Sequence, residues 1–150
     1  MPSIRVPARL ENLEPCKTYL RENLPARFAD QWNNVQLVAE ELLVNVFSYA
    51  YPQGDTGEAQ INLETAPAPA GEDGSDSDED WLVFTVRDWG EPFNPFEEVP
   101  DPDLTLDVEA RPVGGLGIFL IKQVSARQEW AYDEGANTIH IYFRPSEASA

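Results

Sequence analysis

Residues 40–51 read EELLVNVFSYAY and end a segment whose apolar residues recur at helical spacing. We expect these apolar positions to form one stripe that faces the core: Val35, Val38, Leu42, Val46 and Tyr49. Glu41 and Asn45 are four residues apart, so they lie one above the other beside this stripe, whereas Glu40 is rotated well away from Asn45. A carboxylate and a carboxamide therefore share one surface of a helix.

This pair alone does not define a site. An isolated Glu and Asn at this spacing are more often a solvated Glu and an Asn that happens to lie on a helix. The pattern becomes informative only if partners occur elsewhere in the chain. Of the two adjacent glutamates, we choose Glu41 as the one that can act together with Asn45.

Two further blocks provide such partners. The run VFTVRDWG (83–90) reads as a strand that ends at Asp88 and Gly90 and opens into the turn-rich EPFNPF (91–96). The run RPVGGLG (111–117) is a glycine-rich loop that leads into a helix beginning IFLIKQV, and such a junction presents free backbone N–H groups to an anion. Taken singly, such an Asp more often simply begins a turn, and such glycines are more often only a flexible helix entry.

The three blocks together resemble a known family. E-x-x-x-N, D-x-G and G-G-x-G, in this order, are similar to the ATP-binding boxes of the histidine-kinase-like (GHKL, or Bergerat-fold) ATPases. Within that superfamily the N-x-x-x-Y-A-Y ending, DWGEPFNP and GGLGIFLI resemble the small anti-sigma-factor serine/threonine kinases. The resemblance runs from about Ile4 to Phe143.

The resemblance implies an ATP-binding serine/threonine protein kinase of bacterial signal transduction. As an anti-sigma regulatory factor it would phosphorylate a serine on a STAS-type anti-anti-sigma protein, with a sigma factor as a further partner and a homodimer as its assembly. The alternative is a non-catalytic ATP-gated protein-binding module. The presence of Glu41 favours the kinase, because binding alone needs no general base.

The same resemblance assigns roles to residues. Asn45 would offer its amide oxygen to Mg²⁺, and Glu41 would act as general base. Asp88 would accept a hydrogen bond from the adenine amine, and Gly90 would let the base approach the backbone. The remaining residues expected to bind ATP lie in the glycine-rich loop and at the helix start: Arg111, Gly114, Gly115, Leu116 and Gly117.

Composition sets limits on partners and location. The chain has 150 residues, of which 42% are hydrophobic, which suits one domain over residues 1–150. A net charge of -17 without a basic cluster argues against nucleic acid as a direct partner. No apolar run is long enough for a membrane span and no secretion signal is visible, so we expect a cytoplasmic protein without membrane contact. The single Cys16 on an expected helix suggests core packing.

The pattern predicts an α/β (α+β) fold: a two-layer sandwich with a mostly antiparallel mixed sheet and helices on one face. The expected strands and helices are 3–6, 13–23, 33–50, 59–64, 81–86, 116–126, 128–132 and 138–143. Residues 66–80 are acidic and without large apolar side chains, so we expect a disordered loop at a hairpin tip. Residues 97–110 lack periodicity, which fits a mobile lid or an ordinary surface loop equally well, and the family resemblance implies that this segment is the ATP lid.

Overall fold

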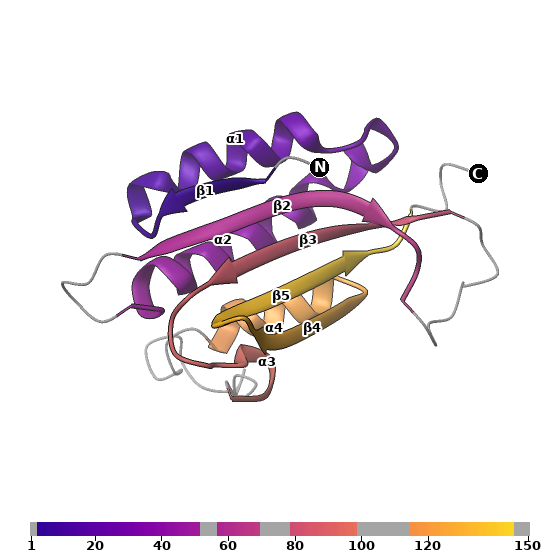
Figure 1. Ribbon diagram of the computed structural model, residues 1–150. Helices are drawn as coiled ribbons and strands as arrows, with labels where there is room; N and C mark the ends of the chain where they lie inside the picture. Colours follow the sequence, from indigo (N-terminus) through magenta and orange to yellow (C-terminus); the bar gives the residue numbers. More distant parts are fainter. Residues whose placement is uncertain (1–2, 52–56, 70–78, 99–114, 146–150) are drawn as a thin grey trace.

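The computed structural model describes residues 3–51, 57–69, 79–98 and 115–145. These residues form a five-stranded sheet with helices packed on one face (Figure 1). The elements in chain order are β1 (Ile4–Pro7), η1 (Leu10–Asn12), α1 (Leu13–Asn23), η2 (Ala26–Gln31), α2 (Trp32–Tyr49), β2 (Glu58–Ala66), β3 (Trp81–Asp88), α3 (Pro95–Glu98), α4 (Gly115–Val124), β4 (Arg127–Asp133) and β5 (Ala136–Phe143). The predicted two-layer α+β architecture is confirmed.

The sheet has the strand order β1-β2-β3-β5-β4, and each of these neighbouring pairs is antiparallel. The central strand β3 is buried along almost its whole length, as expected for a strand covered by neighbours on both sides. β2 pairs with β3 from Ala59 opposite Asp88 to Ala66 opposite Trp81, so the hairpin predicted around the acidic segment is present. Ala66 itself belongs to β2, and residues 70–78 of the predicted disordered loop lie outside the described residues.

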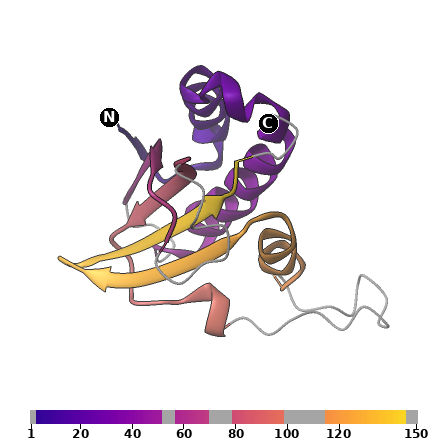
Figure 2. The same cartoon turned by 90° about the vertical axis from the view of Figure 1, so that its right-hand side faces the viewer.

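The helices α1, α2 and α4 cover the same face of the sheet (Figure 2). α2 buries a continuous apolar stripe consisting of Val35, Val38, Ala39, Leu42, Leu43 and Val46. The sequence prediction was wrong for Tyr49, which is 64% exposed, because the helix ends at this residue and its side chain lies beyond the last buried turn. Cys16 on α1 is fully buried in the core, as predicted, and burial raises the pKa of its thiol to about 11.

The short helix α3 was not predicted. Its first turn is closed by side chains, because Oδ1 of Asn94 accepts the Phe96 N–H at 3.0 Å and Oε2 of Glu98 accepts the Asn94 N–H at 2.5 Å. Glu97 and Glu98, at the start of the predicted lid, are therefore helical, and residues 99–110 lie outside the described residues.

The β4–β5 hairpin closes the sheet through a two-residue turn at Glu134 and Gly135, both with positive φ, of 52° and 77°. In the part of the chain that the structure describes, none of the helices has the length and apolar character needed to cross a membrane.

Candidate functional site

The carboxylate of Glu41 lies against the first turn of α4. A Cβ added at Gly117 would collide with Oε2 of Glu41 and would stand 3.1 Å from its Cδ. Only glycine at this position lets the carboxylate approach so closely. Burial, and secondly the negative charge of Glu40, raise the pKa of Glu41 above the usual glutamate value. Glu41 is thus a half-buried carboxylate at the N-terminal end of a helix, with an increased affinity for a proton.

The neighbouring Glu40 is directed elsewhere. Nζ of Lys17 on α1 lies 2.6 Å from Oε1 of Glu40 and also 3.6 Å from Glu14. This hydrogen bond with Glu40 is the main reason why the pKa of Lys17 is raised. The two adjacent glutamates therefore face different helices, Glu40 toward α1 and Glu41 toward α4.

Asn45 lies one helical turn after Glu41 on α2 and is half-buried. Its amide has no hydrogen-bond partner among the residues that the structure describes. Among these same residues there is also no group of three or more His, Cys, Asp and Glu side chains that would hold a metal by themselves. A single available amide oxygen fits Mg²⁺, which commonly takes one or two protein oxygens and completes its shell with phosphate and water.

Asp88 is the last residue of β3 and is only 6% exposed. Its Oδ1 accepts two hydrogen bonds, from the Gly90 N–H at 3.0 Å and from Nδ2 of Asn137 at 3.1 Å. Burial raises the pKa of Asp88, and these two hydrogen bonds partly oppose the increase. No partner of Oδ2 is found within the described ranges, so this oxygen is available to accept a donor from a ligand.

Sequence reasoning missed Asn137, which fixes Asp88. Its side chain uses both donors and accepts twice: Nδ2 donates to Asp88 and to the carbonyl of Glu91 at 2.9 Å, and Oδ1 accepts from the Phe93 N–H at 2.9 Å and from Nε1 of Trp130 at 3.0 Å. A signal was present in the sequence. Asn137 continues the alternation of the buried residues Ile139 and Ile141 on β5, so it is a polar residue at a core-facing position.

A second glycine brings the Asp88 loop onto α2. A Cβ at Gly90 would collide with the carbonyl oxygen of Ala50, the residue that follows α2, and would lie 3.1 Å from its carbonyl carbon. Glu41 and Ala50 are nine residues apart, which corresponds to about 13 Å along a helix. The loop after β3 and the start of α4 thus meet the same helix at two points, with Asn45 between them.

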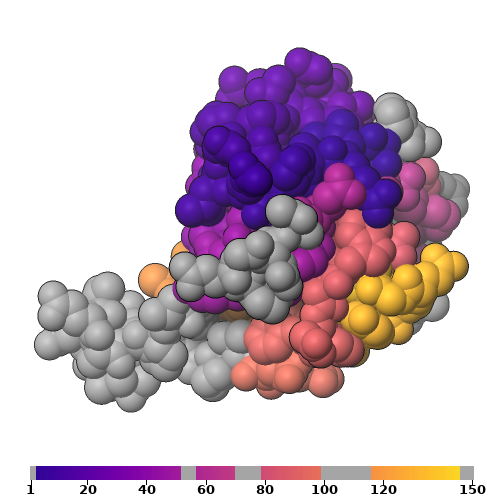
Figure 3. All heavy atoms as spheres, turned by 60° about the vertical axis from the view of Figure 1, so that its left-hand side comes forward, coloured from indigo at the N-terminus to yellow at the C-terminus, as the bar shows by residue number. Residues whose placement is uncertain are grey.

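The segment after β3 also contacts the tip of the sheet. Figure 3 shows this segment, in salmon, between the β4–β5 hairpin, in yellow, and the N-terminal elements, in indigo. The contacts of Asn137 with Asp88, Glu91 and Phe93 account for the first of these neighbours. The position of Asp88 therefore depends on β5, on the loop after β3 and, through Gly90, on the end of α2.

The remaining candidate residues are only partly described. Arg111 and Gly114 lie outside the described residues. Gly115 is the first residue of α4, and Leu116 follows it with 37% of its surface exposed. The start of α4, where a phosphate-binding role was expected, is therefore helical and lies beside Glu41, as the contact with Gly117 shows.

A cavity of about 490 Å³ lies elsewhere, between α3 and the outer strand β4, and includes none of the predicted site residues. It is lined in part by His140, which alternates with buried neighbours on β5 and forms a 2.8 Å hydrogen bond with Thr85 on β3. His140 is thus a cross-strand residue, paired with Thr85 of β3. The described candidate site residues lie on α2, on α4 and at the end of β3.

Comparison with known families agrees with this geometry. Residues 6–143 match the model of the histidine kinase-like ATPase domain, while no curated protein matches the chain. The match runs from within β1 to the end of β5 and contains each described site residue, and it supports ATP binding by this domain. Because the family model covers most of its length, the chain belongs to the histidine kinase-like ATPase domain family.

Proposed function

We propose that the chain is an ATP-dependent serine/threonine protein kinase that phosphorylates a serine of a STAS-type anti-anti-sigma protein and so acts as an anti-sigma regulatory factor. The family supports the ATP-binding part of this proposal. The observation that carries the kinase part is the position of Glu41. Its carboxylate lies at the first turn of α4, one helical turn from Asn45, where a base is needed and a binding module would need none.

In this proposal, ATP recognition is divided between two points along α2, near its middle at Glu41 and at its C-terminal end beside Gly90. At the Gly90 end, Oδ2 of Asp88 is free to accept a hydrogen bond from the exocyclic amine of adenine, and the missing side chain of Gly90 lets this loop pack against the carbonyl of Ala50. Near Glu41, the N–H groups at the start of α4 would face the phosphates. Asn45 would hold Mg²⁺, which would neutralise phosphate charge in this acidic protein.

In the transfer step, the serine oxygen of the partner forms a bond to the γ-phosphorus, and the bond from this phosphorus to the bridging oxygen of ADP breaks. The proton of the serine hydroxyl goes to the carboxylate of Glu41. The raised pKa of Glu41 makes it a better proton acceptor than an ordinary glutamate. Glu40 is held by Lys17 and does not take this role.

The partners follow from the same proposal. A STAS-type protein supplies the serine, a sigma factor is the second partner, and the kinase acts as a homodimer in the cytoplasm. The net charge of -17 supports protein partners rather than direct contact with nucleic acid.

The decisive experiment is incubation of the protein with Mg·ATP and the STAS-type proteins of the same organism, followed by intact-mass measurement. We expect a cognate partner to gain one phosphate, and its Ser→Ala variant to gain none. If no partner is phosphorylated while ATP changes partner affinity, the chain is an ATP-gated binding module instead.

A further inference from the structure

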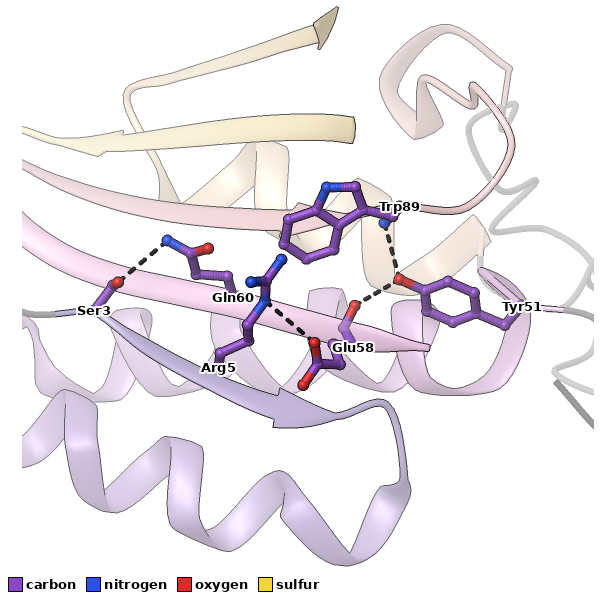
Figure 4. A network of polar contacts seen from close by, with 6 residues as sticks. All are labelled: Ser3, Arg5, Tyr51, Glu58, Gln60 and Trp89. Atoms are coloured by element: carbon purple, nitrogen blue, oxygen red, sulfur yellow. Dashed lines mark hydrogen bonds and ion pairs between the residues drawn. The ribbon is translucent and has the colours of Figure 1, made fainter. Parts of the chain in front are cut away.

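The backbone between Asp88 and Gly90 is held by a closed ring of four residues from four parts of the chain (Figure 4). The hydroxyl of Tyr51 accepts the Trp89 N–H at 2.8 Å and donates to the carbonyl of Glu58 at 2.5 Å. The carboxylate of Glu58 lies 3.3 Å from Nε of Arg5, and the guanidinium of Arg5 lies 4.1 Å from the centre of the Trp89 ring. These contacts connect the residues after α2 with β1, β2 and the loop after β3.

Tyr51 is the member of this ring with the most constrained position. It follows the end of α2 by two residues, and its ring lies so close to Gly57 that a Cβ there would collide with it. Burial is the main cause that raises the pKa of its hydroxyl, so the group stays protonated and donates at neutral pH. By contrast, the Arg5–Glu58 ion pair is about half exposed and contributes little by itself.

The hydrogen bond from Trp89 has a direct consequence for its two neighbours. Asp88 precedes Trp89 and carries the free carboxylate oxygen, and Gly90 follows it and donates to the other oxygen of the same carboxylate. The Trp89 N–H belongs to the peptide unit between Asp88 and Trp89, so fixing it fixes the backbone directly after the carboxylate that reads the base. Adenine presents an amine to a carboxylate, whereas guanine presents a carbonyl oxygen at the corresponding position. Small displacements of Asp88 therefore change the relative affinity for adenine and guanine nucleotides. They leave the binding of the phosphates unchanged.

We propose that Tyr51 is a positioning residue for base recognition, whose hydroxyl holds the Asp88-Trp89-Gly90 backbone against β2 so that adenine is preferred over guanine. This inference rests on the proposed binding of ATP. It assigns Tyr51 no contact with the nucleotide and no part in the transfer of phosphate.

The chain offers a matched pair of variants. Tyr51→Phe removes only the hydroxyl and keeps the ring on Gly57, whereas Tyr49→Phe removes the hydroxyl of an exposed tyrosine two residues earlier. Calorimetric titration with Mg·ATP, Mg·GTP and Mg·tripolyphosphate is carried out on both variants and on the wild type. For Tyr51→Phe we expect about a tenfold loss of ATP affinity, the scale of one buried hydrogen bond, and no change for GTP or tripolyphosphate. Tyr49→Phe should match the wild type with every ligand.

Amide hydrogen exchange at Trp89, measured without nucleotide, tests the same hydrogen bond independently of ATP. We expect faster exchange in Tyr51→Phe and no change in Tyr49→Phe. Unchanged exchange or an unchanged ATP to GTP ratio in Tyr51→Phe overturns the inference, and so does an equal loss of all three ligands, which would show general damage to the fold. A wild-type protein that binds no ATP overturns the proposed function itself.

Discussion

Nδ2 of Asn137 donates a hydrogen bond to Oδ1 of Asp88 over 3.1 Å and so joins β5 to the last residue of the central strand. Together with the Gly90 N–H, this bond occupies one oxygen of the carboxylate and fixes its plane. The orientation of the other oxygen, Oδ2, is then set by the protein before any ligand binds. An acceptor that is oriented before binding loses less side-chain entropy when adenine arrives.

The first prediction concerns the cost of this buried acceptor. Asp88→Asn should weaken ATP binding at least tenfold, because it presents a mixed donor and acceptor to the adenine amine. It should not lower the melting temperature at pH 7. Since burial raises the folded-state pKa of Asp88 above 3.8, the stability that Asp88 contributes is fully present below pH 3.8 and is lost as the pH rises through the raised value. Once its carboxylate is ionised, the wild type bears the cost of a buried charge, and the asparagine variant does not.

Calorimetry with ATP and thermal melting at several pH values test this prediction. The exposed Asp30 provides the control, and Asp30→Asn should change neither quantity. A variant Asp88→Asn that keeps full ATP affinity would remove Asp88 from base recognition. A clear loss of stability at pH 7 would show that the carboxylate is mainly structural.

A second prediction follows from the partner of Asp88. Asn137→Asp replaces a donor by a second carboxylate of the same shape at 3.1 Å, and like charges at this distance raise the pKa of the pair further. The variant should melt several degrees lower than the wild type at pH 7, and the difference should shrink on acidification as the pair takes up a proton. Asn62→Asp on β2 is the control, with a small effect at every pH. A deficit that is equal at pH 4 and pH 7 would rule out this coupling.

The sequence is sufficient to predict most of the helices and strands. It is not sufficient to predict all of the side-chain contacts between them. The spacing of Val35, Val38, Leu42 and Val46 predicts α2 because local periodicity reflects which face is buried. Tyr49 fits the same spacing and is nevertheless exposed, since periodicity does not tell where the packing partners end. The helix α3 escaped prediction because its four residues are too few for a periodic signal.

The candidate site was found through local blocks, and what was missed is non-local. Glu41, Asn45 and Asp88 belong to recognisable runs, whereas Asn137 reaches Asp88 across 49 positions of sequence. The contact of Gly117 with Glu41 likewise depends on how α4 packs on α2. Such contacts are decided by sheet order and helix packing, which a single sequence does not specify.

The third prediction concerns Mg²⁺. Because no group of three or more His, Cys, Asp and Glu side chains among the described residues can hold a metal alone, Mg²⁺ should bind only together with nucleotide. Asn45→Ala should lower Mg·ATP affinity by at least tenfold and leave the melting temperature nearly unchanged, since the amide has no partner to lose among the described residues. Asn62→Ala, on β2, serves as the control. Equal ATP affinity with and without a chelator would exclude the metal role of Asn45.

The fourth prediction uses the close approach of Gly117 to Glu41. Alanine at this position favours the helix by up to about 1 kcal/mol, while its Cβ displaces the flexible end of the Glu41 side chain. Gly117→Ala should therefore melt at the same or a higher temperature and yet transfer phosphate about a hundredfold more slowly, because a misplaced reacting group is costly. Combining it with Glu41→Gln should slow the reaction no further than Glu41→Gln alone. A Gly117→Ala enzyme at full rate would show that the position of Glu41 is irrelevant.

The last prediction compares the two adjacent glutamates. Glu41→Gln should keep Mg·ATP and partner affinity and slow phosphotransfer by about a hundredfold or more, the usual contribution of a positioned general base. Glu40→Gln is the matched control: it weakens the contact with Lys17 and removes one of the two causes of the raised pKa of Glu41, but it leaves the Glu41 carboxylate in place, so it should transfer phosphate at close to the wild-type rate at neutral pH. The pH profile gives a second criterion. Since burial raises the pKa of Glu41, the rate should rise with pH through a midpoint above 4.5, and this step should vanish in Glu41→Gln.

Intact-mass measurement of the partner under single-turnover conditions gives both the rates and the pH profile. If Glu40→Gln is the slow variant, the base has been assigned to the wrong glutamate, despite the contact of Glu41 with α4. If both variants transfer at full rate, the enzyme works by positioning and charge neutralisation alone, which phosphoryl transfer permits because its transition state is loose and little proton transfer is needed. Only a slow Glu41→Gln variant with unchanged ATP affinity separates nucleotide binding from phosphate transfer and assigns the base to the carboxylate beside Gly117.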